Sequence, residues 1–423
     1  METPDVHAAI DAVWRIESPR LIAGLVRIVR DVGAAEDLAQ DALVAALEKW
    51  PRDGIPEKPG AWLMAAAKNK AIDGLRHRTL ADRKHADLGR EIDERRQSPR
   101  EAEELENAID DDIGDDLLRL MFTACHPVLP TEARVALTLR LLGGLTTDEI
   151  ARAFLVPETT VAQRIVRAKR VLAEKRIPFE VPHGTDRAAR LASVLEVLYL
   201  VFNEGHLATA GADLTRASLC EDALRLVRVL AELAPADAEV HGLAALLEIQ
   251  ASRLHARTGP SGEPVLLADQ NRALWDHLLI RRGLAALARA DRLGGERGPY
   301  RLQAEIAACH ARARTAAETD CPRIASLYAE LAGRAPSPVV ELNRAVAVAM
   351  ADGPAAGLAL ADALRSEPAL ASYHLLPAVR ADLLERLGRR EEAGAEFERA
   401  ALLTRNARER VLLRERAARA RRA

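Results

Sequence analysis

Helical patterning that runs from one Pro/Gly-rich break to the next constrains the fold of this chain most. Beyond residue 185, such breaks at 258–264, 294–299, 333–338 and Gly353-Pro354 separate successive helical segments. No run of alternating apolar and polar residues competes with the helical spacing. Aromatic residues make up only 3% of the 423 residues, whereas sandwiches and barrels depend on aromatic and β-branched side chains. We therefore predict an all-α protein.

Charge is distributed unevenly, although the formal net charge is only −3. Residues 68–90 hold seven basic and three acidic side chains. Residues 91–116 hold three basic and twelve acidic side chains, and residues 131–176 hold nine basic and five acidic ones. The near-zero net charge excludes a uniformly basic protein that coats nucleic acid. Any nucleic-acid function must therefore come from local basic patches. On charge alone, an acidic solvated loop between two ordinary helical blocks is an equally good interpretation.

These charge blocks and the Pro/Gly-rich stretches divide the chain into three helical modules and a linker. We predict a small domain at 1–85, an acidic linker at 86–113, a second small domain at 114–180 and a helical extension at 181–423.

Chemistry at a catalytic or metal centre is not indicated. The sequence holds no nucleophile–base pair, P-loop or clustered metal ligands, so we expect neither an enzyme nor a cofactor. Asn203, Glu204 and His206 lack a second ligand cluster, and Cys309-His310 is no better a metal site. The four cysteines are far apart, and the most apolar stretch, 191–202, is too short to span a membrane. Without a signal peptide at the start, we expect a cytoplasmic protein.

The clearest local signal is a pair of short helices within residues 145–176. Thr146 and Glu149 form a capping box that opens a helix over 147–154, and Pro157 enforces a turn after it. The next helix carries an apolar stripe, which consists of Val161, Ile165, Ala168 and Leu172.

Its other face is polar and basic, with Thr159, Gln163, Arg167 and Arg170, and with Arg164 and Lys169 on the flanks. These are the elements of a DNA-binding helix-turn-helix, in which arginines grip phosphate and other polar groups read base edges. An amphipathic hairpin with a solvated basic face is the alternative.

Two helices precede this motif. Residues 34–50 place Ala39, Leu43, Leu47 and Trp50 inward, and the opposite side carries Glu36, Asp37, Gln40 and Asp41. After a Pro/Gly-rich break, residues 61–78 form a basic helix with Asn69, Asp73 and Arg76 along one face. Solvation of polar faces is the simpler interpretation of either helix taken alone.

The order of these pieces resembles the sigma-70 family. EDLAQDAL followed by AWLMAAAKNKAIDGLRHR is similar to sigma regions 2.2 to 2.4, and LPTEARVALTLRLLGGLT with the helix-turn-helix resembles region 4.2. The absence of regions 1 and 3 is typical of extracytoplasmic-function (ECF) sigma factors. YLVFNEGH at 199–206 and further motifs resemble the subgroup that ends in a TPR-like helical domain.

The resemblance implies partners for each block. It implies that an acidic face on the first helix docks on core RNA polymerase, namely Glu36, Asp37, Gln40 and Asp41. It implies that the second basic helix engages the −10 promoter element through Lys68, Asn69, Lys70, Arg76 and Arg78. It implies that the helix-turn-helix reads the −35 element through Thr159, Thr160, Gln163, Arg164, Arg167 and Arg170. Pro157 stands where a serine is common in the family.

The extension shows one good TPR-like repeat, because Gly388, Ala393, Phe397 and Ala400 have the spacing of the motif's second half. We therefore predict a TPR-like domain that regulates the factor through a protein or a ligand. A helix-turn-helix regulator with a TPR-like sensor, acting without polymerase, is the alternative function. A helical scaffold with an incidental DNA-like motif is a third interpretation.

Overall fold

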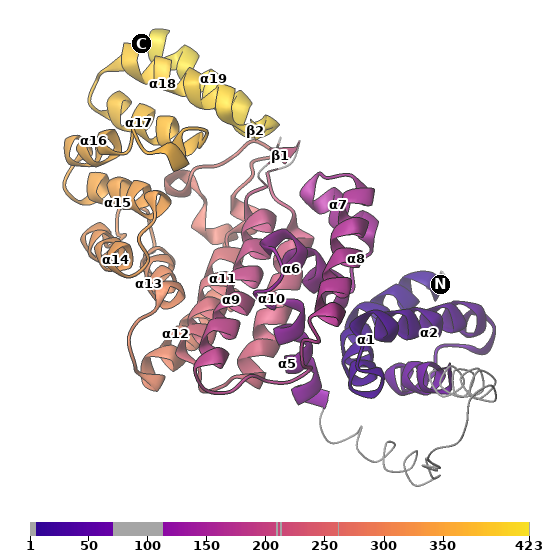
Figure 1. Ribbon diagram of the computed structural model, residues 1–423. Coiled ribbons are helices and arrows are strands. Elements are labelled where there is room, and N and C mark those ends of the chain that lie inside the picture. The colour runs from indigo at the N-terminus through magenta and orange to yellow at the C-terminus, as the bar shows by residue number, and fades with distance from the viewer. Residues whose placement is uncertain (1–5, 71–112, 209, 212–213, 261, 423) are drawn as a thin grey trace, which may run out of the picture. The chain divides into compact units, whose positions relative to one another are not determined.

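The computed structural model describes residues 6–70, 113–208, 210–211, 214–260 and 262–422. These residues form helices joined by short loops, which confirms the predicted all-α class (Figure 1). The named strands of the described chain are two residues long each: β1 (Ala210–Gly211) pairs in parallel with β2 (Arg405–Asn406). The chain divides into two compact units, Met1–Val197 and Leu198–Ala423. The boundary falls inside one helix, α9 (Gly184–His206).

The first unit is built from two long helices and a set of shorter ones. A further helical stretch at 59–70 follows the long pair. The named elements before α9 are α1 (Val6–Val29), α2 (Val32–Asp53), α5 (Ile113–Ala124), α6 (Thr131–Thr138), the π-helix η1 (Leu139–Gly143), α7 (Thr147–Phe154) and α8 (Glu158–Glu174).

Helix α2 packs on α1 through small side chains and through only part of the stripe that the sequence predicted, of which Ala39 and Trp50 are buried. Leu47 is 37% exposed, so its predicted inward position is wrong. The buried face instead consists of Val32, Ala35, Glu36, Ala39, Ala42, Ala46 and Trp50. Alanines there allow the two helices to approach closely, and Trp50 meets Trp62 edge-to-face with ring centroids 5.3 Å apart.

The first half of α9 is tied to α5 and α6 within the same unit. Arg134 of α6 donates to Ser193 Oγ and forms an ion pair with Glu196, with nitrogen and oxygen 3.0 Å apart. Ser193 Oγ in turn donates to the Cys125 carbonyl oxygen. Hydrogen bonds therefore match the burial of these polar groups except at Arg134 Nε, which is buried without a partner.

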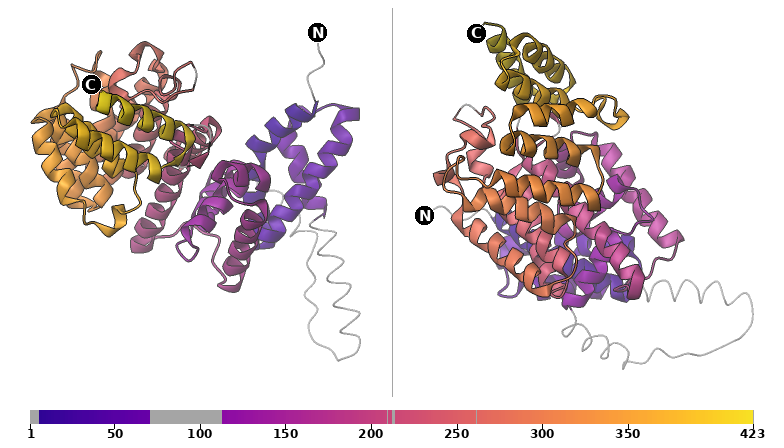
Figure 2. Two further views of the ribbon diagram at one scale, coloured as in Figure 1. Left: turned by 90° about the horizontal axis from the view of Figure 1, so that it is seen from above. Right: turned by 90° about the vertical axis from the view of Figure 1, so that its left-hand side faces the viewer.

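The second unit consists of helices that pack against their neighbours in chain order. Figure 2 shows the later ones stacked in order from orange to yellow. Its named α-helices after α9 are α10 (Ala217–Leu233), α11 (Ala238–Ala251), α12 (His277–Leu293), α13 (Pro299–Arg312), α14 (Cys321–Arg334), α15 (Pro338–Ala351), α16 (Pro354–Ala363), α17 (Leu375–Arg386), α18 (Arg390–Leu403) and α19 (Ala407–Arg422).

Small residues permit close helix contacts in this unit. A Cβ on Gly357 of α16 would lie 2.5 Å from the Ala345 carbonyl oxygen of α15. Gly388, which the sequence placed at a TPR-like turn, has φ of +76° between α17 and α18. Ala393, Phe397 and Ala400 of α18 are fully buried. The TPR-like assignment itself stays a prediction.

Candidate nucleic-acid interface

Helices α7 and α8 form the helical pair predicted from residues 145–176. The capping box is present: Glu149 N donates to Thr146 Oγ1 over 3.1 Å, and Thr146 N donates to Glu149 Oε2 over 2.8 Å. The turn takes a left-handed backbone conformation at Leu155, with φ of 50°. Pro157 then precedes α8, and its carbonyl accepts from Thr160 N over 2.9 Å. Both predicted helix positions are confirmed.

Packing of α8 follows the predicted apolar stripe. Val161, Ile165, Ala168 and Leu172 are all at most 5% exposed, and α8 packs on α6 and α7. This burial confirms the stripe and sets which side of the helix faces outward.

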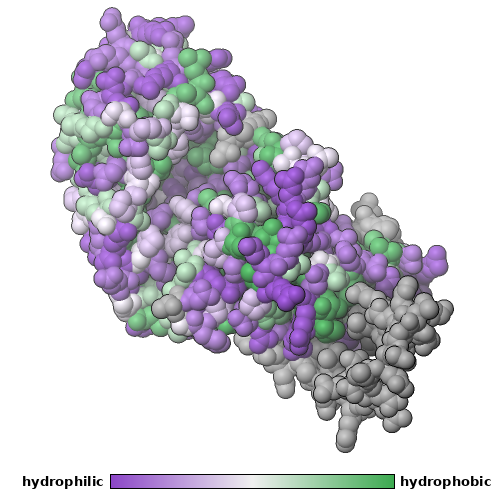
Figure 3. Space-filling view, in the orientation of Figure 1, coloured by the Kyte–Doolittle hydropathy of each residue, from purple (hydrophilic) through white to green (hydrophobic). Residues whose placement is uncertain are grey.

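The outward side of α8 carries the residues predicted to read DNA. Thr159, Gln163, Arg167 and Arg170 are exposed, whereas Thr160 and Arg164 are half-buried. Arg170 lies 3.5 Å from Glu174 on its own helix. Within the described chain, Arg164 and Arg167 form no ion pair, so their guanidinium groups are available to phosphate or base edges. Hydrophilic side chains along α8 are visible in Figure 3.

The second predicted DNA-binding segment is described only in part. Lys68, Asn69 and Lys70 lie on the helical stretch 59–70, with Lys68 half-buried and the other two exposed. Lys70 Nζ lies 3.2 Å from Asp41 Oδ2, an exposed ion pair of small energetic weight. Arg76 and Arg78 lie outside the described residues, as does nearly all of the predicted acidic linker.

The acidic face of α2 is only partly open to a partner. Asp37 and Asp41 are exposed, and Gln40 is half-buried. Two apolar side chains lie beside them on the same helix: Val44 is 52% exposed and Leu47 is 37% exposed. This strip of α2 therefore presents both charged and apolar groups to a partner.

Glu36, the fourth predicted docking residue, is buried to 4% exposure in a contact between α2 and α8. Its Oε1 accepts from Arg140 Nε over 2.6 Å and from Gln40 Nε2 over 3.0 Å, and its Oε2 pairs with Lys169. Burial raises the pKa of Glu36, but Lys169 and Arg140 outweigh this and hold the pKa below its usual value. In this conformation Glu36 therefore joins the two halves of the unit.

Arg140 and Lys169 were not predicted as partners of Glu36. They lie more than a hundred residues from it in sequence, and ion pairs at that separation leave no periodic signal. A second contact of this kind joins Arg15 of α1 to Glu149 of α7, with nitrogen and oxygen 2.5 Å apart. We refer to Glu36, Arg140 and Lys169 as the Glu36 cluster.

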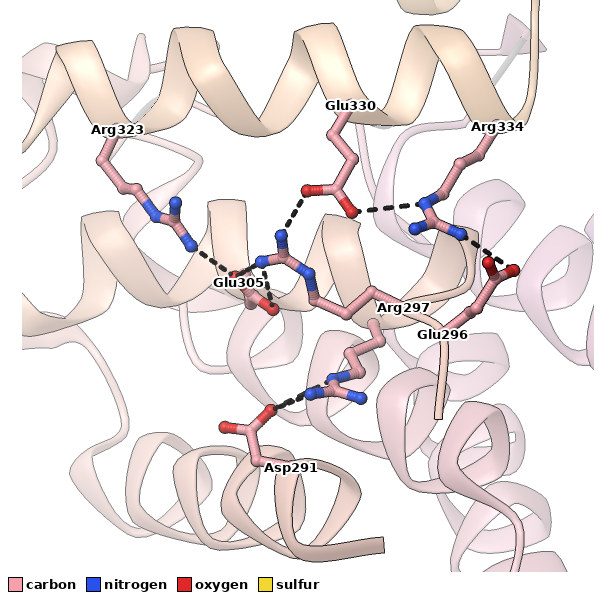
Figure 4. A network of polar contacts seen from close by, with 8 residues as sticks. Asp291, Glu296, Arg297, Glu305, Arg323, Glu330 and Arg334 are labelled. Carbon is pink, nitrogen blue, oxygen red and sulfur yellow. Dashed lines mark hydrogen bonds and ion pairs between the residues drawn. The ribbon is translucent and has the colours of Figure 1, made fainter. Parts of the chain in front are cut away.

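The second unit holds a groove of about 660 Å³ between α12, α13 and α14. Its charges compensate one another. Arg297 pairs with Glu305 and Glu330, and Arg323 also pairs with Glu305 (Figure 4). Arg301 pairs with Asp291 over 2.8 Å. Every carboxylate in this network therefore already holds a guanidinium group.

No group of three His, Cys, Asp or Glu side chains in the described ranges is placed to hold a metal ion. No helix of the described chain is both long and apolar enough to cross a bilayer.

Comparisons with known proteins cover most of the chain. Residues 14–80 match Sigma-70 region 2, residues 119–172 match Sigma-70 region 4, and residues 190–291 match a family of unknown function (DUF6596). An uncharacterized protein of Rhizobium meliloti is 43% identical over 96% of this chain and 94% of its own length.

Two relatives from Mycobacterium tuberculosis match the first half of the chain. The ECF RNA polymerase sigma factor SigC is 26% identical over 40% of this chain and 78% of its own length. The probable ECF RNA polymerase sigma factor SigI is 26% identical over 44% of this chain and 62% of its own length. No solved structure matches the chain.

Proposed function

The chain belongs to the sigma-70 family as an ECF-type sigma factor with a helical C-terminal extension, and we propose that it reads the −35 promoter element through the outward face of α8. The observation that carries the proposal is the exposed row of polar and basic side chains on a helix whose opposite face is buried. Such a row places donors for base edges near the helix N-terminus and guanidinium groups further along.

Within this proposal, the helical stretch 59–70 begins the −10 reading segment. Asn69 and Lys70 present exposed polar groups there, and the predicted contacts Arg76 and Arg78 follow in sequence. The protein would act in the cytoplasm, as a non-catalytic factor for transcription initiation.

Core RNA polymerase is the proposed protein partner, docking on Asp37 and Asp41 of α2. Exposed Val44 and Leu47 add apolar surface to the same docking area. Glu36 and Gln40 complete the predicted acidic face, and the present packing against α8 covers Glu36. Full use of this face therefore requires that α2 and α8 separate.

Promoter binding tests the role of α8. Arg164→Ala and Arg167→Ala should each weaken binding of a −35 duplex by about 1–3 kcal/mol where they contact bases, and should reduce the salt dependence of binding. Arg282→Ala, an exposed arginine on α12, is the matched control. Fluorescence anisotropy of the holoenzyme on labelled promoter duplex measures both quantities. Unchanged affinity in both α8 variants would contradict the proposal.

Co-purification tests the polymerase partner separately. Charge reversal at Asp37 and Asp41 should abolish co-elution with core polymerase, because the docking face loses its negative charge. Reversal at Asp291, a carboxylate of α12, provides the control for a general loss of acidic charge. Retention of polymerase by the Asp37 and Asp41 variant would argue for a DNA-binding regulator that works alone.

A further inference from the structure

The motif YLVFNEGH, which the sigma regions leave unused, lines a cavity in the second unit. The second half of α9 encloses about 90 Å³ together with α11, α13 and α14. Phe202, Leu246 and Ile306 supply apolar wall. The polar lining residues are all half-buried, so the cavity reaches the surface; they are Tyr199, Asn203, His206, Gln250, Gln303 and Tyr328.

A buried arginine and a half-buried one adjoin this lining. Arg253 is 8% exposed and donates to Gln250 Oε1, and Arg257 Nη1 lies 2.9 Å from His206 Nε2. Both partners are uncharged groups, and neither arginine forms an ion pair within the described part of the chain. The Nε atom of Arg257 is buried without a hydrogen-bond partner. Burying a guanidinium group in this way is costly unless a negative charge is supplied.

The electrostatics of neighbouring groups agree with an excess of positive charge. Burial, then Arg257 and Arg272, lower the pKa of Arg253 to about 9. Burial, then Arg257 and Arg253, hold the pKa of His206 well below its usual value, so its ring is neutral at pH 7. Because Nε2 accepts from Arg257, the ring proton is assigned to Nδ1, which is buried without a partner.

Negative charge near Arg257 is already engaged. Burial lowers the pKa of Arg257, and Glu409 opposes this only in part. The Oε2 atom of Glu409 accepts from Thr404 Oγ1 over 2.8 Å and contacts His374 Nε2 at 3.1 Å. The Cys220 thiol, whose pKa burial raises to about 12, is protonated at pH 7. The site therefore combines unused donors with uncompensated cations.

We propose that this cavity binds a small monocarboxylate, with the carboxylate held by His206 and Arg257 and a short apolar tail against Phe202, Leu246 and Ile306. An engineered cavity of about 150 Å³ accommodates benzene, so the present volume suits a smaller ligand, with about four enclosed non-hydrogen atoms and a fifth at the opening to the surface. Ligand binding at this site does not depend on the sigma activity, whereas control of transcription initiation by the ligand rests on the proposed function. Because ligand binding is measured without polymerase, the ligand-binding proposal and the proposed sigma function can fail separately.

Isothermal titration calorimetry of the full chain tests the ligand class. The probes are acetate, propionate, hexanoate and inorganic phosphate, at an ionic strength held constant with chloride. We expect propionate to bind with one site per chain, and hexanoate and phosphate to bind at least tenfold more weakly. Absence of propionate binding overturns the proposal. Equal or tighter binding of hexanoate overturns the cavity as the site, and tighter binding of phosphate overturns the carboxylate assignment.

Variants locate the site. Arg257→Met should weaken propionate binding at least tenfold while leaving the melting temperature of the ligand-free chain unchanged or higher, because it removes an uncompensated buried cation. A purely structural role for Arg257 would instead lower the melting temperature. Arg282→Met, an exposed arginine on α12, is the control and should bind like the wild type. Binding by Arg257→Met within twofold of the wild type overturns the proposal.

A second variant covers a folding failure of the first. His206→Leu keeps a similar side-chain volume and removes the imidazole that donates to the proposed carboxylate. It should reduce propionate binding at least tenfold. Unchanged binding in this variant also overturns the proposal.

Discussion

Two buried charge clusters, one in each unit, differ in whether an opposite charge compensates the buried charge. In the Glu36 cluster, one carboxylate receives Arg140 and Lys169, so its buried negative charge is compensated. Around Arg253 and Arg257, guanidinium groups meet a neutral amide and a neutral imidazole instead. The first arrangement lowers the pKa of an acid, and the second lowers the pKa of bases.

The difference separates a contact that holds the fold from a site that suits a ligand. Removing one partner of a compensated buried pair leaves an unpaired charge and destabilises the protein. Removing a cation from an uncompensated group has no such penalty. The following predictions test this contrast.

The largest effect is expected from Glu36→Gln, which leaves Arg140 and Lys169 without their carboxylate. Removal of one member of a buried ion pair costs about 3–5 kcal/mol. Because the side chains of Arg140 and Lys169 keep 20% and 19% exposure, we expect the low end, about 3 kcal/mol. Guanidinium chloride unfolding followed by tryptophan fluorescence measures it, since Trp14, Trp50 and Trp62 lie in the first unit.

Asp37→Asn is the matched control, because Asp37 is the exposed neighbour on the same helix. We expect it to change the free energy of unfolding by less than about 0.5 kcal/mol. A similar change in both variants would show that the Glu36 cluster is not a stabilising contact.

Acidification should destabilise the second unit next. Burial, then Arg253 and Arg272, lower the pKa of His310 to about 4, against 6.5 for an ordinary histidine. As the pH falls from 6.5 toward 4, the unfolded chain binds a proton that the folded chain does not, so stability falls. The loss is about 2 kcal/mol at pH 5. Hydrogen exchange of peptides from residues 198–423 measures it.

His310→Gln should remove the contribution of His310 and leave that of His206, whose pKa is also depressed. His277→Gln, at an exposed position of α12, should leave the pH dependence unchanged. An equally steep loss of protection in His310→Gln would assign the dependence to other groups.

The Glu36 cluster should respond to acid in a lower pH window. The folded-state pKa of Glu36 is depressed below 4.5, so its stabilising contribution is present above pH 4.5 and is lost as the pH falls through the folded value. The unfolding midpoint of the wild type should therefore drop below pH 4.5 more than that of Glu36→Gln. Parallel pH profiles for the two proteins would contradict this prediction.

The smallest effect is expected at the exposed pair Lys70–Asp41. Both side chains are 51% exposed, so Lys70→Ala should change the free energy of unfolding by less than about 0.5 kcal/mol. Urea unfolding measures this change. A decrease of more than 1 kcal/mol in the free energy of unfolding would show that this exposed pair stabilises the fold as a buried ion pair does.

Local sequence patterns predicted the helix-turn-helix well. The capping box, the turn before Pro157 and the stripe of Val161 and Leu172 depend on residues a few positions apart, and the structure confirms them. The inward face of α2 was partly wrong, because Leu47 is exposed and small alanines pack on α1 instead. Helical periodicity alone does not tell which apolar residues a neighbouring helix will cover.

The sequence by itself determined the helical class, the order of the sigma regions and the polar face of α8. These features follow from propensity, capping and spacing within single helices. Only the tertiary structure decided that Glu36 meets Arg140 and Lys169, and that Arg253 and Arg257 lie beside His206 without a carboxylate. Charge compensation depends on distance and burial in space, and residues distant in the chain carry no local pattern that records either.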